Sequence, residues 1–248
     1  MTGGLVAWSA DQADEVLATY RELTASAPRE LTAAAMIRLA PPAPFVPEEW
    51  HLKPVIAMLV CHSGQTAEAD LVPLRALGDP IFNVVGEKPY VAQQSMVDNL
   101  QPKGLHQYWK AEFLPDLPSE YLGTFRDAAL GVASPLSFSI IFHLAGALNE
   151  HDSGGAVGNQ DAQFISGFTG TWPPEASGDG IVAAVRQGWE AIRPFSTGGN
   201  YVNFQLADDD ATRTADAYRD NYERLRQVKA QYDPHNLFRV NRNIHPSG

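Results

Sequence analysis

The sequence predicts one α+β domain in which a mostly antiparallel sheet carries helices packed mainly on one face. Short apolar runs of strand type alternate with amphipathic stretches of helical spacing along the chain. One run, PVIAMLVC at Pro54–Cys61, is nearly continuous and is typical of a central strand covered on both faces. No internal repeat, low-complexity tract or linker interrupts this pattern, so we expect a single core.

The N-terminal elements begin with a strand that ends at Leu5–Trp8. Ser9 and Gln12 then have the spacing of a capping box, in which each side chain satisfies a free amide of the first helical turn. The helix that follows has apolar residues at spacings of three and four, which indicates one buried face. A loop is expected at Ala40–Trp50, because its four prolines lack the amide that a strand or helix needs.

The remaining elements follow from the same periodicity. Further strands are expected at residues 31–39, 81–85, 107–114, 137–144, 164–171 and 200–206, and helices at 67–77, 119–130 and 179–192. Asp208 or Asp209 can cap one long last helix, which Pro234 ends. Its apolar residues recur at spacings of 4, 3, 3 and 4, which predicts a buried stripe of Tyr218, Tyr222, Leu225, Val228 and Tyr232.

Composition and charge narrow the class of protein. An apolar fraction of 44% with 10% aromatic residues excludes a disordered chain. The formal net charge of −11 argues against a nucleic-acid partner, which requires a basic footprint. The single cysteine, Cys61, excludes an internal disulfide framework. No apolar run reaches the roughly 20 residues that cross a bilayer, and the N-terminus lacks a signal-peptide pattern. We therefore expect a cytoplasmic protein with no membrane partner.

Familiar catalytic motifs are missing from the sequence. It holds no GxGxxG after a strand, no Walker loop, no HExxH and no GxSxG. Cys61 and His62 resemble a nucleophile and its base, but neighbouring residues of a strand point to opposite faces. His106 and His143 have no partner at ligand spacing, so no metal site is predicted. These residues alone point to no particular reaction.

Basic residues gather near the C-terminus, where 7 of the 18 lysines and arginines lie between Arg213 and Arg242. Two interpretations are open. Glu223 and Arg226, at positions i and i+3, are typical of an exposed helix face with ion pairs. A phosphate-binding face is the alternative.

A long ordered pattern occupies the C-terminal part of the chain: YxN[FY] at 201–204, NYxRLxxxK at 221–229 and YDPxNxFRxNxNIxP at 232–246. It resembles the C-terminal segment of the berberine-bridge-enzyme-like FAD-linked oxidases, within the vanillyl-alcohol-oxidase superfamily. Gly3-Gly4 and the stretch QYWKAEF at Gln107–Phe113 look like the substrate domain of this family.

The resemblance implies a substrate-binding domain at residues 1–199 and a flavin-contacting segment at 200–248, packed on the same domain. In the family an FAD-binding domain precedes the glycine pair, which stands here at residues 3 and 4. We therefore expect a truncated chain that works with an FAD-binding domain in cis or in trans, and no flavin attachment at Cys61. Relatives usually carry His-Arg where this chain has Asn159-Gln160, which removes a possible cation near the active face.

The resemblance also implies the chemistry and its residues. An alcohol, sugar or amine would lose a hydride to the FAD flavin while a base takes the neighbouring proton. Tyr201 is assigned to the substrate pocket as the catalytic residue, with Asn203 bonding the flavin or orienting the phenol. Asn241 and Asn243 would place amides toward the flavin edge, since amides offer donors and acceptors without fixed charge.

Each of these residues has a simpler alternative. Tyr201 could be an ordinary half-buried tyrosine, Asn203 could cap a turn, and Asn241 and Asn243 could satisfy backbone groups of the tail. The chain as a whole could be a non-catalytic binding or scaffold domain, or a gene remnant whose flavin-domain face is exposed apolar surface. A colourless protein is expected when the chain is expressed alone.

Overall fold

The computed structural model describes residues 1–98, 102–132, 134–149, 155–209, 211–240 and 242–247. Eight strands form one antiparallel sheet in the order β4-β1-β3-β2-β7-β8-β6, with β5 also paired to β1. The strands are β1 (Thr2–Ser9), β2 (Leu31–Leu39), β3 (Pro54–His62), β4 (Phe82–Asn83), β5 (Gly86–Glu87), β6 (His106–Leu114), β7 (Phe138–His143) and β8 (Phe164–Trp172).

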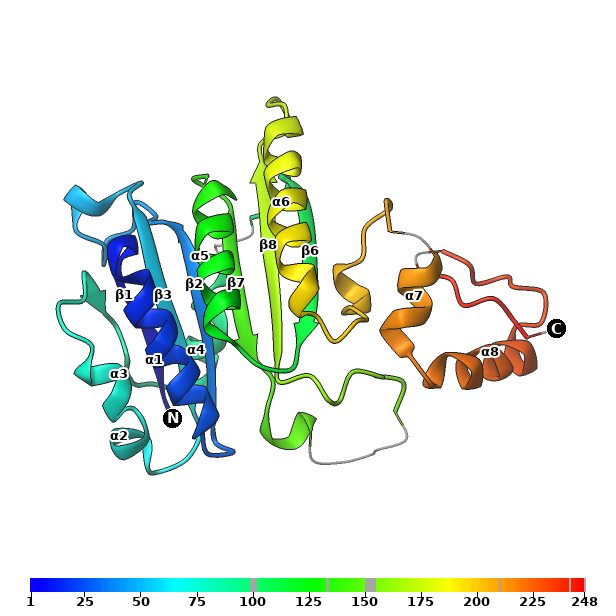
Figure 1. Ribbon diagram of the computed structural model, residues 1–248, viewed down its shortest axis with the longest axis horizontal. Helices are drawn as coiled ribbons and strands as arrows, with labels where there is room; N and C mark the ends of the chain where they lie inside the picture. The colour runs from blue at the N-terminus through cyan, green and yellow to red at the C-terminus, as the bar shows by residue number, and fades with distance from the viewer. Residues whose placement is uncertain (99–101, 133, 150–154, 210, 241, 248) are drawn as a thin grey trace.

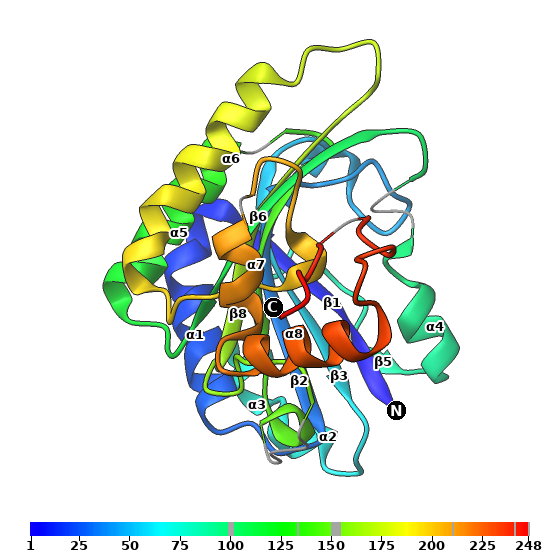
Figure 2. The same cartoon turned by 90° about the vertical axis from the view of Figure 1, so that its right-hand side faces the viewer.

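Helices cover mainly one face of this sheet (Figures 1 and 2). They are α1 (Ala13–Ala25), α2 (Ala67–Asp70), α3 (Val72–Ala76), α4 (Tyr90–Ser95), α5 (Ser119–Val132), α6 (Asp179–Ile192), α7 (Ala211–Tyr218) and α8 (Asn221–Tyr232). The three long helices α1, α5 and α6 lie side by side over the sheet. The predicted fold class, α+β with a mostly antiparallel sheet and helices mainly on one face, is confirmed.

The core lies between the sheet and these three helices. Every second residue of a strand points toward the helices, so Trp8 of β1 and Phe168 of β8 are fully buried there, in one cluster with Tyr20 and Tyr121. The two phenols are satisfied in this apolar layer, since Tyr121 donates to Ser166 Oγ at 2.6 Å and Tyr20 Oη lies 3.1 Å from the Ile141 carbonyl. Buried polar groups that find partners do not oppose the packing.

The opposite face of the sheet, which we call the open face, carries the short helix α4 near one edge (Figure 2). Gln93 of α4 donates to the Val60 carbonyl at 3.1 Å and lies against Gly3. A Cβ on Gly3 would lie 2.5 Å from Gln93 Oε1, so the glycine permits this close approach. Over β2, β3 and β7 the open face carries apolar side chains, such as Met36, Leu59 and Phe142.

Two predictions about the C-terminal elements are wrong. Residues 200–206 form no strand; a 3-10 turn at Val202–Phe204 stands there, closed by the Phe204 amide on the Tyr201 carbonyl. The long last helix is two helices, because Arg219 adopts a left-handed backbone (φ 47°) between α7 and α8. The Arg219 guanidinium binds Asp161 at 2.6 Å and the Gly198 carbonyl at 3.1 Å. These tertiary contacts hold the break.

The predicted buried stripe is also wrong for α8, none of whose residues is buried. Tyr218 and Tyr222 are half-buried, and Tyr232 is 77% exposed. The physical reason is position: α7, α8 and the tail project beyond β6 at one side of the sheet (Figure 1), so little of this chain can cover α8. The division into a domain at 1–199 and a segment at 200–248 stays a prediction. In the described part of the chain, no helix is long and apolar enough to cross a membrane.

Candidate functional site

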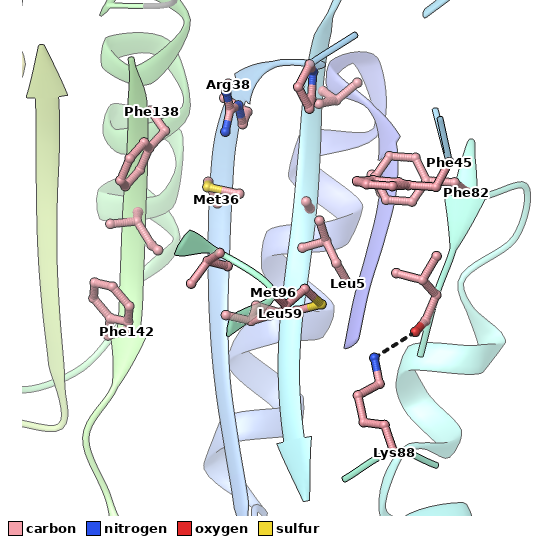
Figure 3. A pocket seen from close by; sticks show the side chains of 17 residues that line it. Leu5, Met36, Arg38, Phe45, Leu59, Phe82, Lys88, Met96, Phe138 and Phe142 are labelled. Carbon is pink, nitrogen blue, oxygen red and sulfur yellow. Dashed lines mark hydrogen bonds between the residues drawn. The ribbon is translucent and has the colours of Figure 1, made fainter. Parts of the chain in front are cut away.

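A pocket of about 420 Å³ lies on the open face of the sheet (Figure 3). Its floor comes from four neighbouring strands: Ala57 of β3 pairs with Ala7 of β1 and with Met36 of β2, and Met36 pairs with Ile140 of β7. Because side chains alternate along each strand, Met36 faces the pocket while Ala35 and Ile37 face the helices. The pocket is thus a direct result of apolar residues on both faces of the central strands.

The rim of the pocket is formed by the proline-rich loop and by β4. Phe45 of the loop meets Phe82 of β4 edge-to-face, with ring centroids 5.2 Å apart. The loop is fastened at its ends, since the Ala40 amide donates to the Lys53 carbonyl at 2.9 Å. Phe45 remains 46% exposed, so the rim is open on this side.

Among the described residues, Arg38 and Lys88 are the charged side chains that line the pocket, and they lie at opposite ends of it in Figure 3. Arg38 is 6% exposed and donates from Nε to the Leu39 carbonyl at 3.0 Å. Its Nη2 lies 3.5 Å from the Pro135 carbonyl, and its Nη1 is buried with no hydrogen-bond partner in the described part of the chain. Burial lowers the pKa of the Arg38 guanidinium.

A row of aromatic rings connects the pocket to Tyr201. Trp109 of β6 meets Phe138 of the pocket at right angles (5.6 Å between centroids) and Phe204 at 5.1 Å. Phe204 in turn meets Tyr201 edge-on at 5.0 Å. Trp109 therefore lies on the open face, and Tyr108 and Lys110 lie on the helix face, because neighbouring residues of a strand point to opposite faces. Tyr201 stands beside this row with 39% of its surface exposed.

The structure brings together two of the four predicted site residues. Asn203 Nδ2 donates to Tyr201 Oη at 2.7 Å. The contact comes from the 3-10 turn and not from the strand alternation that was expected. This hydrogen bond holds the two side chains together, and the roles predicted for Tyr201 and Asn203 stay predictions.

The other two residues belong to the C-terminal tail. Asn241 lies outside the described residues. Asn243 Nδ2 approaches His245 Nδ1 at 3.4 Å, and no contact among the described residues joins it to Tyr201. Arg242, next to it, donates to the carbonyl of Gln205, so the tail passes beside the turn that carries Tyr201.

Asn243 also bears on whether a flavin fits this chain. Its Oδ1 is buried and has no hydrogen-bond partner among the described residues, so it can accept from a ring N–H. The amides near the turn, Asn203 and Asn243, are neutral and suit the carbonyl and imide edge of an isoalloxazine. These residues fit contact with the flavin edge of FAD.

A partly buried polar network, which we call the β6 clamp, connects the turn to the sheet. Lys110 of β6, whose side chain is 5% exposed, binds Asp208 at 3.0 Å and Asp209 at 2.8 Å. Tyr108 and Arg186 also donate to Asp208, at 2.6 and 2.8 Å. Burial alone would raise the pKa of Asp208, but these three donors lower it far below its usual range. Asp208 and Asp209 were expected to cap the last helix, but in the structure they form ion pairs with Lys110.

Glu112 extends the clamp along the same strand. Its Oε1 accepts from Trp189 Nε1 at 2.7 Å and from Arg213 at 3.1 Å, and its Oε2 accepts from Ser196 at 2.7 Å. Glu112 is 3% exposed, so its charge is compensated inside the protein. In the basic C-terminal region, Arg226 also pairs with Glu223, at 3.0 Å. These pairs favour the ion-pair interpretation of that region over phosphate binding.

Asn159, one of the two positions at which the sequence was expected to depart from the family pattern, does not line the pocket. It is buried, and its Nδ2 donates to the Ala217 carbonyl of α7 at 3.2 Å. The same side chain packs against Gly199, where a Cβ would lie 2.4 Å from Asn159 Oδ1. Asn159 therefore connects the loop before β8 to the C-terminal segment.

Comparison with known proteins finds relatives that share sequence patterns with this chain. Residues 200–245 match the family model described as berberine and berberine-like. The FAD-linked oxidoreductase YvdP of Bacillus subtilis is 27% identical over 198 residues, which are 79% of this chain and 40% of that protein. An FAD-linked oxidoreductase of Dictyostelium discoideum is 24% identical over 177 residues, or 70% of this chain and 38% of that protein.

Solved structures share the fold at low identity. 6-Hydroxy-D-nicotine oxidase from Arthrobacter nicotinovorans matches with a TM-score of 0.76 and 19% identity, and a variant of berberine bridge enzyme with 0.78 and 16%. Each match covers 100% of this chain and 55% of the other chain. The chain thus spans about half the length, or less, of the relatives it matches.

These matches show that the chain shares the fold of part of these FAD-linked oxidoreductases. The resemblance predicted from the sequence is confirmed, and the chain is similar in sequence and fold to the berberine-bridge-enzyme-like FAD-linked oxidases.

Sequence reasoning missed the pocket itself, including Met36, Arg38, Phe138 and Phe142. A signal was present: the run at Pro54–Cys61 is apolar on both faces, whereas the predicted helices cover mainly one. A second apolar face without helices indicates a binding surface.

Proposed function

We propose that this chain is the substrate-binding portion of an FAD-dependent oxidoreductase, and that it acts with an FAD-binding domain in cis or in trans. The observation that carries the proposal is the apolar pocket on the open face, connected by Trp109 and Phe204 to Tyr201. An apolar sheet face of this kind needs a cover, and a flat flavin ring held by another domain provides one.

The FAD-binding domain would also meet the C-terminal segment. Tyr232, Leu237, Phe238 and Val240 are 77, 76, 78 and 84% exposed, respectively. Apolar side chains exposed together in this way are typical of a protein interface. The proposed partner thus contacts both the open face and the tail.

The chain's own residues have distinct tasks in the proposed reaction. When bound, FAD supplies the hydride acceptor for the C–H bond of an alcohol, sugar or amine. The pocket binds the body of the substrate and excludes water from it. Tyr201 takes the proton from the substrate oxygen or nitrogen at its Oη. Asn203, 2.7 Å from that oxygen, donates a hydrogen bond that orients the phenol for this step.

The flavin edge would be held by the neutral amides near the turn. Asn243 offers its Oδ1 to a ring N–H, and Asn203 can donate to a ring carbonyl. We assign Asn241 to the same edge on the strength of the family pattern alone.

A reconstitution experiment tests the proposal. The chain is purified alone, and also fused to the N-terminal portion of the B. subtilis relative that precedes the matched region. We expect a colourless chain and a yellow fusion, whose flavin absorbance is bleached by a member of a panel of alcohols, sugars and amines under anaerobic conditions. The Tyr201→Phe fusion should bind FAD and lose most of the bleaching rate, by about 100-fold or more for a general base.

Other results would contradict the proposal. If the chain alone binds FAD stoichiometrically, the proposal that a separate domain binds FAD is wrong. If the yellow fusion is bleached by no compound of the panel, the chain is a non-catalytic binding domain.

A further inference from the structure

We infer that the open-face pocket binds a small molecule with an apolar body and a carboxylate, and that Arg38 is the residue that receives the carboxylate. The inference names the substrate class for the site of the proposed function, and so rests on that proposal.

The charge of the pocket is opposite to that of the chain. The whole protein has a formal net charge of −11, with 29 acidic and 18 basic residues. Among the described residues that line the pocket, Arg38 and Lys88 are basic and none is acidic. A cavity with low-dielectric walls focuses the field of such cations, so an anion is favoured inside it.

Arg38 lacks the partner that a buried cation needs. No carboxylate pairs with it among the described residues. Its hydrogen bonds go to the backbone carbonyls of Leu39 and Pro135, at 3.0 and 3.5 Å. Within the same described ranges its Nη1 has no hydrogen-bond partner, and the atom is shielded from water, so hydration does not offset the deficit. A guanidinium presents N–H groups in a fork that matches the two oxygens of a carboxylate.

The position of Arg38 puts this fork at one end of an apolar cavity. Arg38 pairs across the sheet with Val55 and Phe138, and all three side chains line the pocket. A ligand that fills the floor over Met36 and Ile140 therefore brings one end to the guanidinium. Cavities of about 300–1,000 Å³ hold small molecules, and 420 Å³ falls in this range.

The same lining disfavours a sugar as the substrate. Sugar hydroxyls need polar partners along the whole ring, because a buried hydroxyl without a hydrogen bond is costly. The pocket floor offers Met36, Ala57, Leu59, Ile140 and Phe142, whose side chains carry no oxygen or nitrogen. An aromatic or alkyl body with a single anionic end matches this distribution.

A matched pair of probes tests the inference: naphthalene-2-carboxylate and naphthalene-2-carboxamide, which share shape and differ in charge. Binding to the full chain is measured by titration calorimetry. We expect the carboxylate to bind about 10- to 100-fold more tightly, as for a hydrogen-bonded charge in a shielded site. The variant Arg38→Met should abolish this preference and still bind the carboxamide, which also shows that the pocket is intact. Arg38→Lys should retain part of the preference.

Lys88→Met is the matched control, because it removes the other lining cation at the far end of the pocket. The preference for the carboxylate should survive in this variant. Equal binding of the two probes to the unmodified chain, or a preference that follows Lys88 and not Arg38, overturns the inference. It is also overturned if the fusion with the FAD-binding portion loses the preference, since a carboxylate of that portion then occupies Arg38.

These outcomes separate the inference from the proposed function. A fusion that is bleached by substrates, but whose unmodified pocket binds both probes equally, contradicts only the carboxylate assignment. A pocket that prefers the carboxylate through Arg38, in a fusion that no substrate bleaches, supports the ligand class and contradicts the oxidoreductase function.

Discussion

Substitution of Lys110 by methionine should release the C-terminal segment from the sheet without unfolding the core. The Lys110 side chain is 5% exposed and joins β6 to Asp208 and Asp209 at 3.0 and 2.8 Å. Its ammonium also lies over the rings of Tyr108 and Trp189, 5.5 and 5.4 Å from their centroids. Methionine keeps most of the length and loses all of these polar contacts.

The free-energy cost of Lys110→Met depends on the hydrogen-bond partners that Asp208 and Asp209 keep. Leaving a buried charge without any partner costs about 3–5 kcal/mol. Here Asp208 keeps Tyr108 and Arg186, and Asp209 keeps Arg213 at 3.2 Å. The cost should therefore be nearer the value for hydrogen bonds to a charged group, about 2 kcal/mol.

Hydrogen exchange measured by mass spectrometry checks this prediction. Peptides from α7 should exchange about 30-fold faster in Lys110→Met, which corresponds to about 2 kcal/mol. Peptides from β2 should keep the exchange rate of the unmodified protein, because β2 lies in the sheet interior between β3 and β7. Lys88→Met, which removes an ammonium bonded to the Val84 carbonyl, is the control and should leave both regions unchanged. Unchanged exchange in α7 would refute the reasoning that the clamp holds the segment.

Three further predictions concern single positions. Arg38→Met should raise the free energy of unfolding of the ligand-free chain by about 1–3 kcal/mol, measured by urea denaturation. The reason is that the substitution removes a buried guanidinium with which no carboxylate of the described residues pairs. A lower free energy of unfolding in the variant would contradict this prediction. Gly4→Ala should lower the free energy of unfolding by about 2 kcal/mol or more, since Gly4 has φ 146° and a Cβ would lie 2.3 Å from the Val84 carbonyl oxygen. Gly86→Ala is the control: no atom lies within 4 Å of the added Cβ, so the loss should be less than half as large. Hydrogen bonds from Lys229 and from the Leu237 amide lower the pKa of Asp233 to about 2, so its contribution to the tail turn is complete above about pH 4 and is lost as the pH falls through about 2. The NMR shift of the Leu237 amide should titrate with that midpoint, and a midpoint near 4 would show that Asp233 does not hold this turn.

Local periodicity predicts the parts of the fold that depend on neighbours in sequence. The bounds of β2 and α6 agree with the predicted ranges 31–39 and 179–192. The break at Arg219 could not be predicted, because the groups that its guanidinium binds, Asp161 and the Gly198 carbonyl, lie 58 and 21 residues away in the sequence. The ion pair of Lys110 with Asp208 could not be predicted either, because 98 residues separate them in the sequence.

The candidate site shows the same limit. The family pattern named Tyr201 and Asn203, but a turn and not the expected strand brings their side chains into contact, so that their roles stay predictions. The apolar run at Pro54–Cys61 indicated a second apolar face, but the residues of the pocket could not be predicted, because its floor forms only when β7 pairs with β2. Single residues such as Arg38 carry no sign in the sequence that their charge will be buried without a carboxylate beside it.

Both margins of the sheet carry contacts that hinder strand addition. At β1 the two-residue strands β4 and β5 occupy the outer hydrogen-bonding positions, and at β6 the Thr197 amide donates to the Phe113 carbonyl at 2.9 Å. Exposed strand margins are where sheets of different molecules join into larger assemblies. A partner that stacks on the open face therefore meets this chain through surface shape and apolar contact, and not through backbone pairing.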